Sequence, residues 1–261
     1  MQGSELIERL NEAFELRASG DVSAALASFE SLEMLSEHSR DISALRLFQS
    51  YCLMDMGNSG GALERMNGVT RSDLDLPLRG NYEYQFARVL HSLNRSQDAI
   101  AHAKSALRIY ESLTPDLKSA DAISNARIIL GTLLAESNRC AEAAVMLRQI
   151  TEQDQGWVFA KMRLGDCYME KGKYTEAIEC YMAVASGNLK ADSAATNDAF
   201  RNIGVSYYWL GEHAKAVDYL SRVKDAYLEH PYLNERILRF LALSNLQIGS
   251  VERKKKRWLP F

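Results

Sequence analysis

The chain has 261 residues, of which 47% are hydrophobic and 25% are charged, and its formal net charge is −3. So small a net charge argues against a generally basic surface of the kind that binds nucleic acid. No apolar run approaches the roughly 18 residues that cross a bilayer, and the first residues lack the pattern of a secretory signal. We therefore expect a cytoplasmic protein.

A recurring pattern is anchored on six alanines, whose residue numbers differ in turn by 37, 37, 44, 34 and 39: Ala25, Ala62, Ala99, Ala143, Ala177 and Ala216. Five residues before each alanine is a residue type that readily takes a positive φ at a helix end: Gly20, Gly57, Asn94, Asn138, Gly172 and Gly211. Twelve residues before it is a small residue that lets two helices cross closely: Ala13, Ser50, Ala87, Gly131, Gly165 and Gly204. The pattern predicts an array of helix–turn–helix repeats.

In chain order, the predicted repeats cover residues 6–39, 43–76, 80–113, 124–157, 158–191 and 197–230. The second helix of each repeat is expected to include an apolar residue seven positions after its anchor: Leu32, Val69, Ala106, Ile150, Val184 and Val223. A last helix over 232–249, with a turn at Gly249, repeats the first half of the pattern, while its anchor position falls on Lys254. We expect this helix to cap a single domain of residues 1–249, followed by a separate basic tail of residues 250–261.

The fifth and sixth repeats resemble the tetratricopeptide repeat (TPR) family. The segment Leu164–Tyr181, with Gly165, Gly172 and Ala177, is close to the ideal motif, and Ile203–Ala216 is nearly as close. The resemblance extends over residues 5–249, although the first two repeats depart from it at Ser50 and Met66. It implies an all-α, right-handed solenoid of six TPR-like repeats plus a C-terminal capping helix. In this family the first helices line a concave surface, which implies a scaffold or adaptor that binds other proteins.

Candidate partner-binding residues are those that point away from the packing stripe of each first helix: Tyr84, Arg88, Phe159, Arg163, Arg201, Asn202, Tyr208, Trp209, Arg236 and Arg239. Aromatic and arginine side chains contribute much of the binding energy of protein interfaces, and arginines hold carboxylates with two hydrogen bonds. We expect an extended or helical segment of another protein in this concave groove.

Alternatives remain for several of these side chains. Tyr84, Phe159 and Phe240 can equally fill the seam between repeats, whereas we expect Trp209 to be partly exposed. The arginines can simply pair with Asp166, Glu170 and Asp198 on a solvated surface. The lysines and asparagines with which some family members grip the carboxylate of heat-shock chaperones are not reproduced, so that partner is not expected.

No catalytic, cofactor or metal motif is found: the five histidines are scattered over the repeats, and the four cysteines form no C-x-x-C pair. We therefore expect no enzymatic activity, no cofactor and no metal. The basic run of the tail, Arg253, Lys254, Lys255, Lys256 and Arg257, leaves four interpretations open: a solvated tail, a nuclear import signal, a contact with an acidic membrane or nucleic acid, and a docking peptide. A membrane-surface or nucleic-acid factor that acts through the tail is the alternative function. The oligomeric state is left open.

Overall fold

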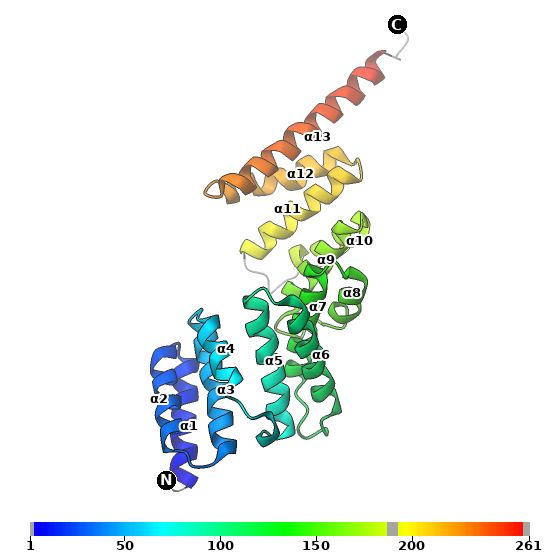
Figure 1. The fold of residues 1–261 in the computed structure, drawn as a ribbon. Coiled ribbons are helices and arrows are strands. Elements are labelled where there is room, and N and C mark those ends of the chain that lie inside the picture. Colours follow the sequence, from blue (N-terminus) through cyan, green and yellow to red (C-terminus); the bar gives the residue numbers. More distant parts are fainter. Residues whose placement is uncertain (1–2, 187–192, 258–261) are drawn as a thin grey trace. The chain divides into compact units, whose positions relative to one another are not determined.

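The computed structural model describes residues 3–186 and 193–257, and side chains are described from residue 5 to 186 and from 193 to 250. These residues form thirteen α-helices and two short 3-10 helices and contain no strand (Figure 1). The expected all-α class is confirmed. The contacts divide the chain into two compact units, Met1–Ser137 (unit 1) and Asn138–Phe261 (unit 2).

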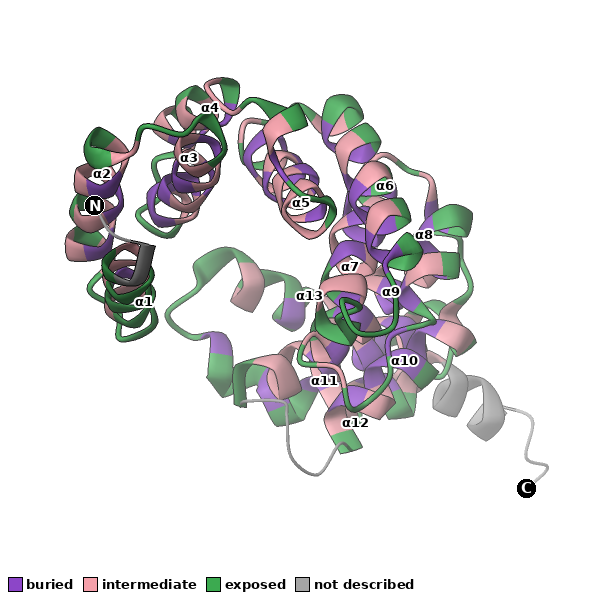
Figure 2. Cartoon of the chain, turned by 90° about the horizontal axis from the view of Figure 1, so that it is seen from below, coloured by how far each residue is buried: buried purple, intermediate pink, exposed green. Residues whose placement is uncertain are grey.

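Unit 1 holds seven α-helices and the 3-10 helix Arg71–Asp73. The α-helices are α1 (Gly3–Ala18), α2 (Val22–Leu35), α3 (Ser39–Asp55), α4 (Ser59–Asn67), α5 (Leu76–Ser92), α6 (Ser96–Ser112) and α7 (Ala120–Glu136). Each helix packs on the next one along the chain, and alternate helices also touch, α3 with α5 and α5 with α7. The buried residues lie on the helices, and the loops between the helices are largely exposed (Figure 2).

Unit 2 holds six α-helices and the 3-10 helix Lys224–Tyr227. The α-helices are α8 (Cys140–Leu147), α9 (Trp157–Glu170), α10 (Tyr174–Ser186), α11 (Ser193–Trp209), α12 (His213–Val223) and α13 (Pro231–Arg257). Consecutive helices pack together, and α11 also contacts both α9 and α13. The division between the units falls in the turn of the fourth predicted repeat, so the single domain of residues 1–249 remains a prediction.

The predicted turns are confirmed. Among the described residues, a positive φ occurs at the six positions five residues before the anchors: Gly20, Gly57, Asn94, Asn138, Gly172 and Gly211. At four of these turns the next residue donates its backbone N–H to a carbonyl five residues back, a hydrogen-bonded helix end that requires the left-handed residue: Asn58 to Leu53, Arg95 to Leu90, Lys173 to Tyr168 and Glu212 to Tyr207. The sequence pattern therefore marks the end of every first helix that it identified.

The predicted helix crossings are confirmed as well, since all six anchor alanines are fully buried. A Cβ atom added to Gly165 would lie 2.5 Å from the ring of Tyr181, and one added to Gly204 would lie 2.6 Å from Cγ of Leu220. Both distances are too short for real contacts. Glycine is therefore required at both positions, because the second helix packs too closely for a side chain. The residue that packs against the glycine is Tyr181 or Leu220, four positions after the anchor alanine.

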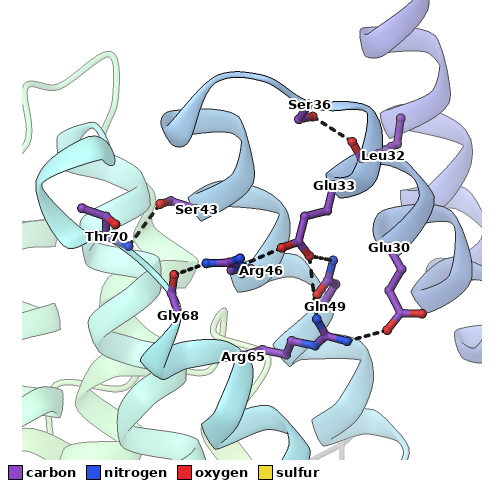
Figure 3. Close-up of polar contacts among 10 residues, drawn as sticks. All are labelled: Glu30, Leu32, Glu33, Ser36, Ser43, Arg46, Gln49, Arg65, Gly68 and Thr70. Carbon is purple, nitrogen blue, oxygen red and sulfur yellow. Dashed lines mark hydrogen bonds and ion pairs between the residues drawn. The ribbon is translucent and has the colours of Figure 1, made fainter.

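A polar network ties α2, α3 and α4 together in unit 1 (Figure 3). Arg46 of α3 donates to Glu33 of α2 at 2.7 Å and to the backbone oxygen of Gly68 at 2.6 Å. Buried Gln49 donates to the second oxygen of Glu33 at 2.7 Å, and Arg65 of α4 pairs with Glu30 at 2.7 Å. The network joins three successive helices through charged and polar side chains, although the buried Oε1 atom of Gln49 has no partner in it.

Three predicted helix ends are wrong. The second helices of the second and fourth repeats end at Asn67 and Leu147, before Val69 and Ile150. At the C-terminal end, α13 does not stop at Gly249 but continues to Arg257, so Arg253–Arg257 are helical and not a separate tail. Gly249 has no positive φ, and its helix penalty of about 1 kcal/mol is outweighed by the strong helix formers that follow it. The predicted tail residues 258–261 lie outside the described part of the chain.

Candidate partner-binding groove

A groove lies among the first helices of unit 2. A cavity of about 270 Å³ opens between α9, α11 and α13, with one side chain from α10 at its base. Its lining is Asp166, Met169, Glu170, Tyr181, Arg201, Asn202, Val205, Leu233, Arg236, Ile237 and Phe240. We call this the unit 2 groove. Three of the predicted partner-binding residues, Arg201, Asn202 and Arg236, line it.

The phase of α11 places its polar side chains in the groove. Ile203, Gly204 and Ser206 are buried against neighbouring helices. Arg201, Asn202 and Val205 lie one or two positions away from this stripe and line the cavity. The helical period of 3.6 residues thus separates a packing side from a groove side on one helix.

A chain of hydrogen bonds fixes the polar floor of the groove. Tyr181 donates its hydroxyl to Oδ1 of Asp166 at 2.8 Å, and Asn202 approaches the same oxygen at 3.5 Å. Arg201 donates from Nε to Oδ1 of Asn202 at 3.2 Å and pairs through Nη1 with Asp198 at 3.1 Å. Since Tyr181 reaches the groove past Gly165, the tight crossing of α9 and α10 also positions this acceptor.

Burial raises the pKa of Asp166 above its ordinary value, and this effect outweighs the hydrogen bond from Tyr181 and the charges of Arg163 and Arg201, which lower it. The folded chain therefore holds this proton to higher pH than the unfolded chain, whose carboxyl titrates near 3.8. It follows that stability falls as the pH rises through the interval between the two pKa values.

We expect Asp166→Asn to stabilise the protein at neutral pH, because an amide cannot ionise and still offers Tyr181 an acceptor oxygen. Urea unfolding at several values from about pH 4 to about pH 7 measures this, and the advantage of the variant should shrink as the pH falls. A variant less stable than the wild type at neutral pH would show that the ionised carboxylate is stabilising.

Two arginines of α13 are exposed, of which Arg236 lines the groove and Arg239 does not. Neither of them forms an ion pair within the described ranges. The guanidinium of Arg236 lies 5.6 Å from the centre of the Tyr232 ring. On α9, Arg163 lies 5.1 Å from the ring of Phe159, which is half-exposed, and 3.9 Å from Asp166.

An aromatic cluster adjoins the groove through Phe240. The ring centres of Tyr208 and Phe240 are 5.0 Å apart, and those of Tyr208 and Trp209 are 5.4 Å apart. Trp209 also stacks on Tyr174 at 6.3 Å and remains 55% exposed, as the sequence predicted. Aromatic residues of this kind are enriched in protein interfaces.

The remaining two predicted residues belong to α5 of unit 1. Arg88 lies 5.9 Å from the ring centre of Tyr84 and donates to Gln85 at 3.0 Å. Tyr84 is half-buried, and burial raises the pKa of its hydroxyl. These two side chains form a local pair on their own helix, and their role in binding remains a prediction.

Sequence reasoning missed four lining residues, Met169, Tyr181, Leu233 and Ile237. Met169 lies in the last turn of α9, and Tyr181 is on a second helix. Leu233 and Ile237 are in the first half of the helix that was interpreted as a cap. A large aromatic four residues after an anchor, facing a glycine in the previous helix, is the signal that could have indicated Tyr181.

The fold and groove define a solenoid of helix–turn–helix repeats, a class that generally serves as a scaffold for protein–protein interaction. Two family models for the tetratricopeptide repeat match residues 160–186 and 198–227, the fifth and sixth repeats. These matches identify the fifth and sixth repeats as tetratricopeptide repeats. No curated protein sequence matches it.

Solved structures share the fold at low sequence identity. PilF of Pseudomonas aeruginosa superposes with a TM-score of 0.68 at 12% identity, over 90% of this chain and 96% of that one. A signal transduction ATPase with numerous domains and a TPR sensor, from Pyrococcus horikoshii, gives 0.73 at 16% identity, over 96% of this chain and 42% of that one. NprR in complex with its cognate peptide NprX gives 0.58 at 17% identity, over 93% and 73%.

Nowhere in residues 3–186 and 193–257 is a helix both long and apolar enough to cross a membrane.

Proposed function

We propose that the protein is a non-catalytic cytoplasmic adaptor or assembly factor that holds a segment of a partner protein in the unit 2 groove. The observation that carries this proposal is the cavity between three successive first helices, which joins two arginines and an asparagine to an exposed aromatic cluster. NprR, whose fold is similar, was solved with a bound peptide, which supports a peptide-like ligand.

The groove suits a segment that carries both a carboxylate and a large apolar side chain. Arg236 has no carboxylate partner in the described structure, so a carboxylate of the segment can pair with it without displacing an existing ion pair. An apolar side chain two or three residues away would reach Phe240, Tyr208 and Trp209, where burial of aromatic area contributes most of the binding energy.

Affinity capture from native lysate tests the proposal. We expect Trp209→Ala and Arg236→Ala each to weaken capture of the same partner, with a loss of roughly 1–4 kcal/mol in binding free energy once that partner is purified. Arg222→Ala and Leu228→Ala are matched controls, because both residues are exposed in unit 2 and outside the groove. Both groove variants should keep the wild-type helicity and melting temperature. Undiminished binding by the double groove variant would remove this function.

A further inference from the structure

The helix α13 has the register of a first helix, and no second helix follows it among the described residues. In the full repeats of unit 2, α9 packs on α10 and α11 packs on α12. Counted back from Lys254, which stands where an anchor would be, the crossing position of α13 is Ala242 and the turn position is Gly249. The second half of α13 therefore has the register that receives a second helix.

These same positions form an open, exposed face of α13. Ala242, Asn245, Leu246 and Gly249 lie along this face, which we call the α13 seat. Leu246 is 63% exposed, and a Cβ atom on Gly249 would meet no atom within 4 Å. A different side of the helix, at Ile237 and Leu241, packs in the core with Leu220 and Val223 of α12. Figure 1 shows this half of α13 extending beyond α12.

The occupied crossings of unit 2 show what such a seat accepts. Tyr181 covers Gly165 and Leu220 covers Gly204, each from the position four residues after an anchor alanine. An occupant of the α13 seat would be an amphipathic helix with an alanine followed, four residues later, by a bulky apolar residue. The second helices α6 and α12 have 17 and 11 residues, which sets the length.

Charge selects the kind of helix. Between Pro231 and Arg257, α13 carries seven basic and two acidic residues, although the chain as a whole has a net charge of −3. Five of the seven, Arg253–Arg257, follow the seat directly and continue the same helix. A basic helix, or the α13 of a second copy, would be repelled there, whereas an acidic helix gains both attraction and faster association.

We propose that the α13 seat binds an acidic amphipathic helix of a partner protein, which completes a seventh repeat in trans. This binding is distinct from that of the unit 2 groove, although one helix serves both: its first half lines the groove and its second half forms the seat.

A designed probe tests the proposal directly. The first probe is a fluorescent stapled peptide with the length of α12, which keeps the apolar spacing of Ala216, Val217, Leu220 and Val223 and has glutamate at all other positions. The second probe is the same peptide with lysine in place of every glutamate. Fluorescence anisotropy with the whole chain should show binding of the glutamate probe, with affinity falling as salt is added, and binding of the lysine probe at least about a hundredfold weaker.

Leu246→Asp should weaken binding of the glutamate probe by at least about tenfold, because the leucine side chain would lose its burial in the complex. Leu228→Asp is the matched control, since Leu228 is also 63% exposed in unit 2, and it should bind as the wild type does. Changing Arg253–Arg257 to glutamine should weaken binding and flatten its salt dependence. Trp209→Ala should leave probe binding unchanged, which separates this test from that of the groove.

Four results would overturn the proposal. The first is no binding of the glutamate probe to the wild type, and the second is equal binding to Leu246→Asp. The third is a wild-type dimer in sedimentation that Leu246→Asp converts to a monomer, which would assign the seat to a second copy. The fourth is binding of phosphatidylserine vesicles or duplex DNA in place of the probe, which would make the basic end of α13 a membrane or nucleic-acid contact.

Discussion

Replacement of Arg71 by alanine should destabilise the protein by about 2–3 kcal/mol, because it leaves a buried carboxylate with only one partner. The side chain of Glu83, on α5, is 2% exposed, and Arg71 Nη2 lies 2.8 Å from its Oε1. His102 Nδ1, on α6, lies 2.7 Å from the other oxygen. The ring of His102 is itself held against Phe86, with centres 4.4 Å apart, so it cannot move to replace the arginine.

The double variant Arg71→Ala/Glu83→Gln is the decisive control for this prediction. Glutamine keeps the shape of Glu83 without its charge, so the double variant should recover much of the stability lost in Arg71→Ala. Urea unfolding followed by circular dichroism measures both. If the double variant were less stable than Arg71→Ala, the loss would come from the packing of Arg71 and not from an unpaired buried charge.

Gly204→Ala should destabilise by about 1–3 kcal/mol, since the added methyl group collides with the next helix. Its Cβ would lie 2.6 Å from Cγ and 3.2 Å from the backbone nitrogen of Leu220, and a backbone atom cannot move aside as a side-chain end can. The melting temperature should fall, with the helical content of the folded state unchanged.

Gly249→Ala makes the same chemical change at another glycine within a helix and should have the opposite sign. A Cβ atom there meets nothing within 4 Å, so the variant should gain about 0.5–1 kcal/mol from the better helix propensity of alanine. Stabilisation by both substitutions would mean that the crossing at Gly204 is looser than described. Destabilisation by Gly249→Ala would instead support the turn that the sequence predicted at this position.

The fold could be predicted where a single residue must meet a local requirement. A positive φ restricts Gly172 and its equivalents to glycine or asparagine, and a crossing restricts Gly165 and its equivalents to small residues. The ends of α4, α8 and α13 obey no such rule. Each of these helix ends depends on how tertiary packing and local helix propensity compete at that site. A pattern shared by six repeats carries no information about this local competition.

The groove could be predicted in part for the same reason. Arg201 and Asn202 line the cavity, and their position follows from the buried stripe of α11, which fixes the phase of the whole helix. Their role in binding stays a prediction. Tyr181 was not predicted to line the groove, because its reach past Gly165 depends on how close two helices come. The preference of the α13 seat for an acidic helix also required the structure, since it depends on α13 continuing through the basic run.

The two groove arginines differ in what binding would demand of them. Arg201 is held by Asp198 and Asn202 and lies over the ring of Tyr227, so most of its rotamer freedom is lost when the chain folds. Arg236 is exposed and retains its rotamers, and immobilising such a side chain costs about 0.5–1.5 kcal/mol on binding. Arg201 would therefore bind a ligand in one fixed position and so set the register of the ligand. Arg236 could adjust its side chain to carboxylates at different positions.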